Sequence, residues 1–230
     1  MIALPAAPLL WLTVTLIVFE GADLVSRRSG RHPLCHPVLF ATPVLIALLL
    51  ISSTPYRVYR EATAPLTFLL GPAVVGLAVP VWAQRRLIRR LAVPIGVALL
   101  AGATTAIVSA VGILWLTGAP PVLLASIAPR ATTSPVAMAL AQQLHGIPPL
   151  AVAIVLFAGV VGAMTATPLF DRMGIRDYRA RGFAIGVSAH GLGAARAFQV
   201  DATAGAFASL AMALNAIATA ALLGVLAALL

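Results

Sequence analysis

Long apolar runs separated by short polar stretches make up most of this chain. A membrane-spanning helix needs about 20 consecutive apolar residues, and several runs approach that length. They lie at roughly 5–25, 36–54, 62–84, 91–117, 149–170, 182–200 and 203–230. A shorter run at 119–146 is interrupted by prolines and polar residues. The pattern predicts an all-α, polytopic membrane helical bundle with about seven spans.

The composition supports a membrane protein and excludes an ordinary soluble domain. The 230 residues are 61% hydrophobic and 9% charged, whereas soluble domains carry about 25% charged residues. The net charge of +9 comes from 15 arginines against six acidic residues, with no lysine. The arginines cluster in short loops, which indicates membrane topology and headgroup contact. We therefore expect a lipid bilayer around the chain and no nucleic-acid partner.

The basic loops orient the predicted spans, because short loops rich in arginine stay in the cytoplasm. Loop 26–32 carries three arginines and loop 85–90 carries four. Two predicted spans separate these loops, so both lie inside and the N-terminus lies outside. Loop 171–181 carries four arginines and two aspartates, and we expect it inside as well.

The side of the membrane on which loop 171–181 lies depends on whether the interrupted segment 119–146 crosses the membrane. If the segment crossed the membrane fully, loop 171–181 would lie outside. A re-entrant hairpin that turns near 129–135 places the loop inside, although a full span remains the alternative. Each leg, about 9–12 residues, is also too short to cross a hydrocarbon core of about 30 Å. Irregular backbone at that depth lines a cavity or is buried in protein.

Two similar segments suggest an internal repeat. Both begin at a proline: Pro72-Ala-Val-Val-Gly-Leu-Ala and Pro135-Val-Ala-Met-Ala-Leu-Ala. Under the expected topology, the half-helices that start at these prolines run in opposite directions, as in inverted-repeat transporters. We expect one integral membrane domain, 1–230, with possible repeat halves 1–117 and 118–230.

The segment 129–135 contains the first candidate site. Arg130 at membrane depth costs about 3 kcal/mol, so such a charge normally faces a cavity or a substrate. Its planar guanidinium suits a carboxylate, and the positive start of a half-helix would add to its charge. Thr132, Thr133 and Ser134 could donate to the same anion, and Ser134 is placed to cap the helix. In the alternative interpretation, Arg130 reaches an interface and the hydroxyls only cap.

The second candidate site is the stretch Ser188 to Arg196. His190 can exchange a proton near physiological pH, which suits proton coupling or carboxylate binding. His190 and Arg196 would face different sides of a continuous helix, so only a break at Gly191 or Gly193 would bring them together. In the alternative, His190 bonds to a neighbouring helix and Arg196 reaches the outer headgroups.

The remaining polar residues give no positive case for an enzyme, a metal site or a cofactor. No nucleophile elbow, phosphate loop or carboxylate pair is visible in the sequence. His32, Cys35 and His36 lie close together, but prolines separate them and no fourth ligand is near. Asn215 and Ser109 could line a cavity, although lone amides and hydroxyls usually bond between helices.

Several segments resemble the LrgB/CidB family. The densest similarity lies in Ser126–Ala139, Ala189–Arg196 and Gly205–Met212, and Gly71–Pro80 and Gly174–Asp177 fit as well. The resemblance covers nearly the whole chain. This chain has Arg130 where family members usually have lysine, and Ala204 where a glutamate is common.

The resemblance implies a multi-pass protein of the bacterial inner membrane. Such proteins are called holin-like or antiholin-like, are linked to murein hydrolase control and autolysis, and often act with a smaller LrgA/CidA-type partner. The chain also looks like the membrane part of the plastid glycolate/glycerate transporter, and some bacterial relatives are associated with pyruvate uptake. We therefore expect a homo-oligomeric secondary transporter of a small monocarboxylate; the alternative is a regulator of autolysis.

Overall fold

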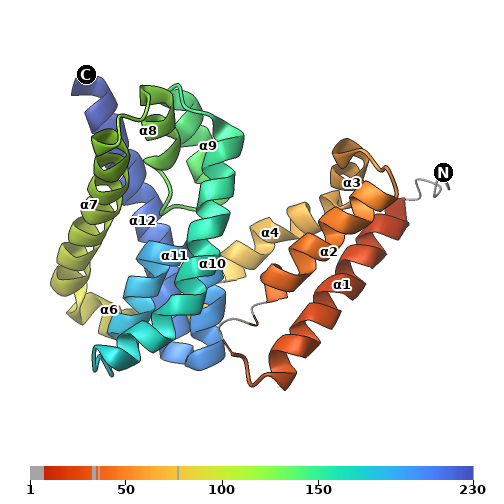
Figure 1. The fold of residues 1–230 in the computed structure, drawn as a ribbon. Helices are drawn as coiled ribbons and strands as arrows, with labels where there is room; N and C mark the ends of the chain where they lie inside the picture. Colours follow the sequence, from red (N-terminus) through yellow and green to blue (C-terminus); the bar gives the residue numbers. More distant parts are fainter. Residues whose placement is uncertain (1–7, 33–34, 36, 77, 230) are drawn as a thin grey trace. The chain divides into compact units, whose positions relative to one another are not determined.

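The computed structural model describes the chain except residues 1–7, 33–34, 36, 77 and 230, and every regular element in the described part is a helix. The chain forms two compact units, Met1–Gly76 and Leu77–Leu230. Figure 1 shows the helices and their labels. Four helices of the described residues are long and apolar enough to cross a membrane: Leu9–Arg28, Ala92–Leu116, Pro148–Arg172 and Ala202–Ala228.

Unit 1 is held together around its first helix. The Trp11 ring packs edge-on against Tyr59 at 5.9 Å, and the Tyr59 hydroxyl accepts a hydrogen bond from Thr15 Oγ1 at 3.2 Å. Toward the end of the first helix, the Asp23 carboxylate accepts from the guanidinium groups of Arg27 and Arg31 at 2.6 and 2.7 Å. The helices are α1 (Pro8–Arg28), α2 (Pro37–Ile51), α3 (Tyr56–Ala62) and α4 (Ala64–Gly76).

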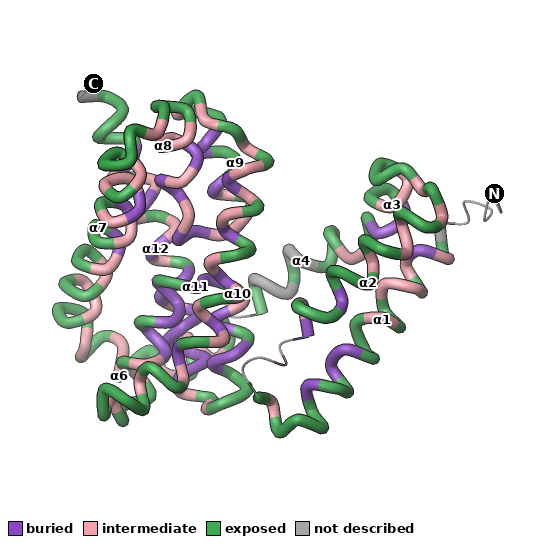
Figure 2. The backbone as a smooth tube through the Cα atoms, viewed as in Figure 1, coloured by how far each residue is buried: buried purple, intermediate pink, exposed green. Residues whose placement is uncertain are grey.

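Unit 2 contains the three candidate membrane spans that begin at Ala92, Pro148 and Ala202, a further helical element with a break inside it, and several short helices. Prolines stand in the first turn of the elements that begin at Pro121, Ser134 and Pro148, where the missing N–H costs nothing. Within unit 2, Figure 2 shows the buried residues concentrated in the helices Tyr178–Val200 and Ala202–Leu229. More of them lie in the link between the short helices Pro121–Ile127 and Ser134–Gln143. The helices are α5 (Ala78–Ala83), α6 (Arg85–Arg90), α7 (Ala92–Leu116), α8 (Pro121–Ile127), α9 (Ser134–Gln143), α10 (Pro148–Arg172), α11 (Tyr178–Val200) and α12 (Ala202–Leu229).

The segment 119–146 forms a helical hairpin. Its helices α8 and α9 are only 7 and 10 residues long, and both lie at the end of unit 2 opposite α6 (Figure 1). A hydrogen bond joins the end of this segment to its first helix: the backbone N–H of Ile147, just before α10, donates to Ser126 Oγ on α8 at 2.8 Å. This geometry agrees with the hairpin expected from loop charge, while its depth in a bilayer stays a prediction.

Helix α11 is not the continuous span expected over 182–200. His190 has φ 41° and ψ −128°, which interrupts the helix, and the chain turns back there. A methyl group built on Gly193 would lie 2.7 Å from both the Ile185 carbonyl oxygen and the Ala189 Cβ. Residues 185 and 193 would be about 12 Å apart along a continuous helix. Helix α11 is therefore a second hairpin, made of two half-length helices that meet at His190.

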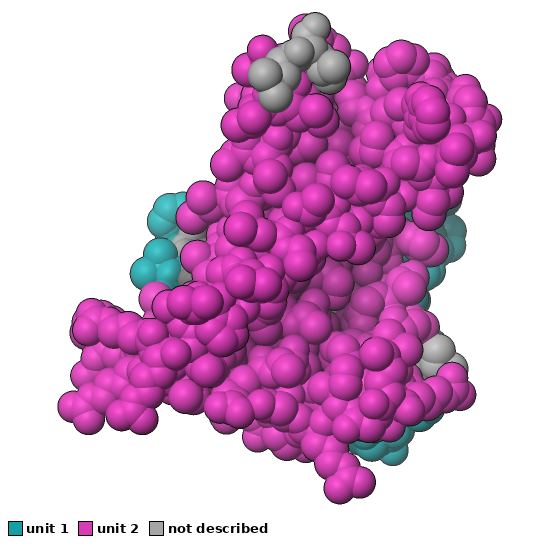
Figure 3. All heavy atoms as spheres, turned by 90° about the vertical axis from the view of Figure 1, so that its left-hand side faces the viewer, with its two compact units in different colours: residues 1–76 teal, residues 77–230 magenta. Residues whose placement is uncertain are grey.

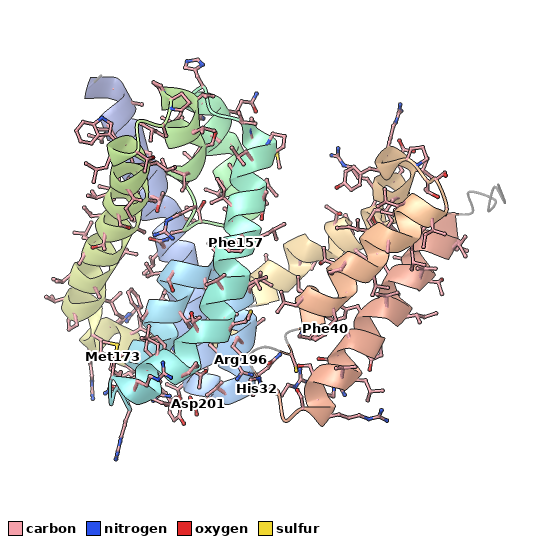
Figure 4. All side chains as sticks on the ribbon, in the orientation of Figure 1. His32, Phe40, Phe157, Met173, Arg196 and Asp201 are labelled. Atoms are coloured by element: carbon pink, nitrogen blue, oxygen red, sulfur yellow. The ribbon has the colours of Figure 1, made fainter. Side chains whose placement is uncertain are left out.

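The two hairpins enter unit 2 from opposite ends. Helices α8 and α9 lie at the end where α12 finishes (Figure 1). The start and the end of α11 lie toward the other end of unit 2 (Figure 4). There the figure labels Met173, before α11, Arg196 in its second half, and Asp201 just after it. Helix α12 begins there, because Asp201 Oδ1 accepts from the backbone N–H groups of Thr203 and Ala204 at 2.7 and 3.0 Å.

Only one of the two half-helices predicted from the proline pattern exists: α9 begins at Ser134, with Pro135 in its first turn. Pro72 lies inside α4 and begins no helix, so the prediction of a half-helix starting there is wrong. The expected span 62–84 is also divided, since it contains α4 and α5 and crosses the boundary between the units. The count of seven spans and the repeat halves 1–117 and 118–230 stay predictions.

The tight turn in α11 makes Gly193 sensitive to substitution. We expect Gly193→Ala to lower the free energy of unfolding by about 1–3 kcal/mol, because the added methyl group would overlap the Ile185 carbonyl oxygen. Gly191→Ala is the matched control, since its nearest neighbour would be the Met212 sulfur at 3.9 Å. Thermal unfolding in detergent measures both, and equal stability of the two variants would contradict the turn.

The turn also fixes the side on which α11 ends. We expect cysteines at Met173 and Val200, in a Cys35→Ala background, to react with an impermeant thiol reagent from the same side of the membrane. Both side chains are exposed, at 62% and 39%. A continuous spanning α11 would place them on opposite sides, so labelling from opposite sides would overturn this fold.

Candidate functional site

Unit 2 contains a cavity of about 680 Å³ between α7 and the first half of α11. The cavity is mostly apolar, with arginine side chains from two different elements. Figure 3 shows the face of unit 2 that carries α7. The lining residues are Leu91, Pro94, Ile95, Ala98, Ala101, Gly102, Thr105, Ala106, Ser109, Arg130, Ala131, Asp177, Arg179, Ala180, Phe183, Ala184, Val187, Ser188 and Phe207.

One face of α7 forms a long wall of the cavity. Its lining positions recur every three to four residues from Leu91 to Ser109, which is the spacing of a single helix face. At about 1.5 Å per residue this wall extends about 27 Å. Most of its side chains are small, and Thr105 and Ser109 add hydroxyls. The cavity therefore follows α7 from its start to deep within the unit.

Arg130 lies at the deep end of this wall, at the turn of the first hairpin. Its Nη2 donates to Ser109 Oγ at 3.4 Å, a long and therefore weak hydrogen bond. Within the described residues, no carboxylate lies within ion-pair distance of Arg130. A half-buried guanidinium thus faces a mostly apolar cavity with one weak hydroxyl partner.

Asn215 on α12 joins the turns of the two hairpins. Its side-chain amide is fully buried, and Nδ2 donates to the carbonyl oxygens of Ala131 at 2.7 Å and Val187 at 3.2 Å. Ala131 follows Arg130, and Val187 lies one turn before the break at His190. Both carbonyl-bearing residues also line the cavity. Asn215 therefore holds together the two backbone segments that close its deep end.

The hydroxyls after Arg130 have local roles in the structure. Thr132 is buried and its Oγ1 donates to the Pro129 carbonyl oxygen at 2.8 Å. Thr133 is the N-cap of α9 and makes no side-chain cap, and Ser134 is the first helical residue. The prediction that Ser134 caps this helix is wrong, because the extended backbone of Thr133 places the helix start one residue earlier than expected.

The second candidate stretch is divided by the turn in α11. Ser188 lines the cavity, and its hydroxyl donates to the Ala184 carbonyl oxygen at 2.8 Å. His190 is buried and its Nε2 lies 3.0 Å from the Val155 carbonyl oxygen on α10. A side chain on Gly159 would overlap the His190 ring. The helix breaks at His190 itself and not at Gly191 or Gly193, and the ring contacts α10, which agrees with the alternative that His190 bonds to a neighbouring helix.

Arg196 lies in the returning half of α11, away from this cavity. Its Nη1 donates to Gln199 Oε1 at 3.3 Å, and it lines a separate space of about 20 Å³ next to Phe170 and Arg181. Figure 4 labels Arg196 toward the end of unit 2 that carries Asp201. Of the predicted site residues, the structure thus brings Arg130 and Ser188 to one cavity. The others lie outside its lining: Thr132, Thr133, Ser134, His190 and Arg196.

Sequence reasoning missed the mouth of the cavity. Asp177 and Arg179 line it, yet as members of a basic loop they indicated only topology. The hydroxyls of Thr105 and Ser109 follow at helical spacing in an apolar span, and this pattern could have revealed the α7 wall. The described residues contain no group of three potential metal ligands. His36, part of the weak metal pattern, lies outside the described residues.

The long apolar helices, the two hairpins and the half-buried arginine define a class: a polytopic α-helical membrane protein with a mostly apolar cavity between a long helix and a broken one. The chain belongs to the LrgB-like family, which matches residues 15–229. This confirms the family that the sequence motifs indicated.

Several curated proteins are similar over nearly their whole length. The uncharacterized protein YwbG of Bacillus subtilis is 32% identical, covering 90% of this chain and 92% of that protein. The holin-like protein CidB of Staphylococcus epidermidis is 26% identical over 94% of both chains. CidB of Staphylococcus aureus is 25% identical over 95% of both. No solved structure matches the chain.

The bridge made by Asn215 leads to a stability prediction. We expect Asn215→Ala to lower the free energy of unfolding by about 1–3 kcal/mol, because it leaves the carbonyls of Ala131 and Val187 buried without this donor. Gln142→Ala is the control, since Gln142 is exposed on α9, and its cost should stay below about 0.5 kcal/mol. Thermal unfolding in detergent tests the difference, and equal midpoints would contradict the role of Asn215.

Proposed function

We propose that this protein is a secondary transporter of small monocarboxylates, of the pyruvate, glycolate or glycerate type, in the bacterial inner membrane. The observation that carries the proposal is Arg130, a half-buried cation without an ion-pair partner among the described residues, at the deep end of an open cavity. A buried charge is costly unless it is paired. A carboxylate that enters the cavity supplies the missing charge.

The surroundings of Arg130 suit a small anion. The guanidinium fork can hold a carboxylate by two parallel hydrogen bonds. The apolar walls of α7 and α11 strengthen that pairing, because they lower the local dielectric constant. Helix α9 begins four residues after Arg130, and its N-terminal end adds a partial positive charge. The Ser109 hydroxyl, which bonds only weakly to the Ala106 carbonyl oxygen at 3.5 Å, can turn toward a remaining oxygen atom of the anion. Thr132, Thr133 and Ser134 follow at the turn.

The two hairpins give the proposed carrier its moving parts. Broken helices near the middle of the membrane are the usual substrate sites of transporters with inverted repeats. Here the turns of the two hairpins meet at Asn215, next to Arg130. A shift of either hairpin against the long helices would change the side from which Arg130 is reached. In this scheme His190, buried beside α10, contributes to proton coupling.

A second candidate function follows from the names of the relatives. CidB is described as holin-like, so a membrane regulator of murein hydrolase activity and autolysis is the alternative. It would act as a homo-oligomer or with a small LrgA/CidA-type membrane protein. A pore of this kind conducts many solutes without saturation, whereas a carrier saturates and shows counterflow.

Uptake into proteoliposomes tests the carrier proposal. We expect saturable uptake of at least one of radiolabelled pyruvate, glycolate and glycerate, with counterflow from preloaded vesicles. Arg130→Ala should lower kcat/KM by about 30- to 150-fold, which corresponds to about 2–3 kcal/mol for a charged hydrogen bond. Arg130→Lys should retain part of the activity, because it keeps the charge and loses the fork.

Arg176→Ala is the matched control, since Arg176 is an exposed arginine of the 171–181 loop outside the cavity lining. Its kcat/KM should stay within about twofold of the original protein. Full transport by Arg130→Ala would refute the role of Arg130. Uptake that rises without saturation for unrelated solutes would favour the pore.

A further inference from the structure

A second arginine lies at the other end of the cavity that contains Arg130. Arg179, with Asp177, lines this cavity where α7 and α11 begin, beside Leu91 and Pro94. Arg130 bonds to Ser109, at the far end of the α7 wall. The two arginines therefore mark the mouth and the deep end of one passage. Both side chains at the mouth are partly exposed, at 43% for Arg179 and 45% for Asp177.

Arg179 is held by a single carboxylate. Its Nη2 donates to Asp177 Oδ2 at 2.6 Å, and its Nε lies 2.9 and 3.0 Å from the two carboxylate oxygens. The backbone N–H of Arg179 also donates to Asp177 Oδ1 at 2.8 Å, which caps α11. Hydrogen bonds from Arg179 lower the pKa of Asp177 to about 2. The carboxylate is therefore ionised throughout the pH range in which a cell operates.

The pair leaves part of the guanidinium available. Asp177 occupies the Nε and Nη2 side of Arg179, and the described residues offer Nη1 no hydrogen-bond acceptor. The pair is bidentate, so it is stronger than an ordinary exposed ion pair, which contributes about 0–1 kcal/mol. An incoming carboxylate can bind Nη1 first and then replace Asp177 with a pairing of the same kind, while water solvates the exposed Asp177 carboxylate.

We propose that Arg179 is a second anion-binding residue, which receives a small carboxylate at the mouth of the cavity by exchanging its bond to Asp177. This site rests on the proposed carrier function and deepens it. Asp177 neutralises Arg179 when no anion is present, so it competes with the bound anion and promotes its release from the mouth. The residue discriminates against cations before they reach the deep site.

A nearby ion pair provides a matched control. Arg181 Nη2 donates to Asp171 Oδ1 at 2.6 Å, and both residues belong to the same basic loop. Neither lines the large cavity. Asp171→Asn therefore removes the same kind of charge as Asp177→Asn at a place where no effect on the passage is expected. Asparagine also preserves the helix cap at position 177, because it caps nearly as well as aspartate.

Thiol modification tests the mouth without requiring transport. A cysteine replaces Ala184, an exposed lining residue between the mouth and Ser188, in a Cys35→Ala background. The probes are the anionic methanethiosulfonate ethylsulfonate and its cationic trimethylammonium counterpart. We expect Arg179→Gln to lower the ratio of anionic to cationic reaction rates by about fivefold, and Asp177→Asn to raise it by about fivefold. Asp171→Asn should leave the ratio unchanged.

Transport kinetics then distinguish two effects of Arg179: hydrogen bonding to the carboxylate and the electrostatic effect of its charge at the mouth. We expect Arg179→Gln to raise the KM for the transported carboxylate by about tenfold with little change in kcat. The double variant Asp177→Asn/Arg179→Gln restores the net charge of the original pair but lacks the guanidinium donors. Its KM should stay raised. A KM that returns to the original value would overturn the binding role of Arg179.

The two proposals fail in different ways. If pyruvate, glycolate and glycerate are not transported by the original protein, the carrier proposal fails, and unchanged rate ratios at residue 184 refute the anion site by themselves. If saturable transport is present and Arg179→Gln keeps the original KM, the carrier stands and the site at the mouth is refuted.

Discussion

The structure of unit 2 depends on one constraint, the need to satisfy backbone carbonyls where helices break. In a membrane, an unsatisfied peptide group costs several kcal/mol, so irregular backbone persists only with internal partners. Both hairpins of unit 2 end in such a break, and one buried amide, Asn215 on α12, donates to a carbonyl in or near each turn. The hairpins can therefore meet inside the unit, and the cavity forms where they meet.

Small residues make this meeting possible. The first half of α11 packs so closely on α12 that a side chain on Gly182 or Gly186 would overlap the backbone of Ala204 or Ala208. Close approach through small residues is the usual basis of helix association in membranes. It places α12 directly behind both hairpins, which is where Asn215 must lie.

The charge pattern of the cavity follows from the same arrangement. Arg130 follows the last residues of α8 and is aimed into the space between α7 and α11, where Ser109 gives it one weak partner. At the mouth, Arg179 is paired with Asp177, which also caps α11. One arginine is thus neutralised and accessible, and the other is enclosed and lacks an ion pair within the described residues. This difference is the structural basis of the proposal that an anion passes from Arg179 to Arg130.

The sequence by itself determined the membrane class and the family, and it predicted a hairpin at 119–146 and a site at Arg130, because apolar length, loop charge and a charge in an apolar segment are properties of local composition. It did not reveal the turn at His190, since residues 182–200 form one apolar run with no proline and a backbone reversal leaves no trace in hydropathy. Pro72 misled for a similar reason: a proline is compatible with a helix start and with a helix interior. Only the tertiary structure decided which polar groups share a cavity, because residues 109, 130, 179 and 188 come from three separate elements whose approach is set by packing against α12.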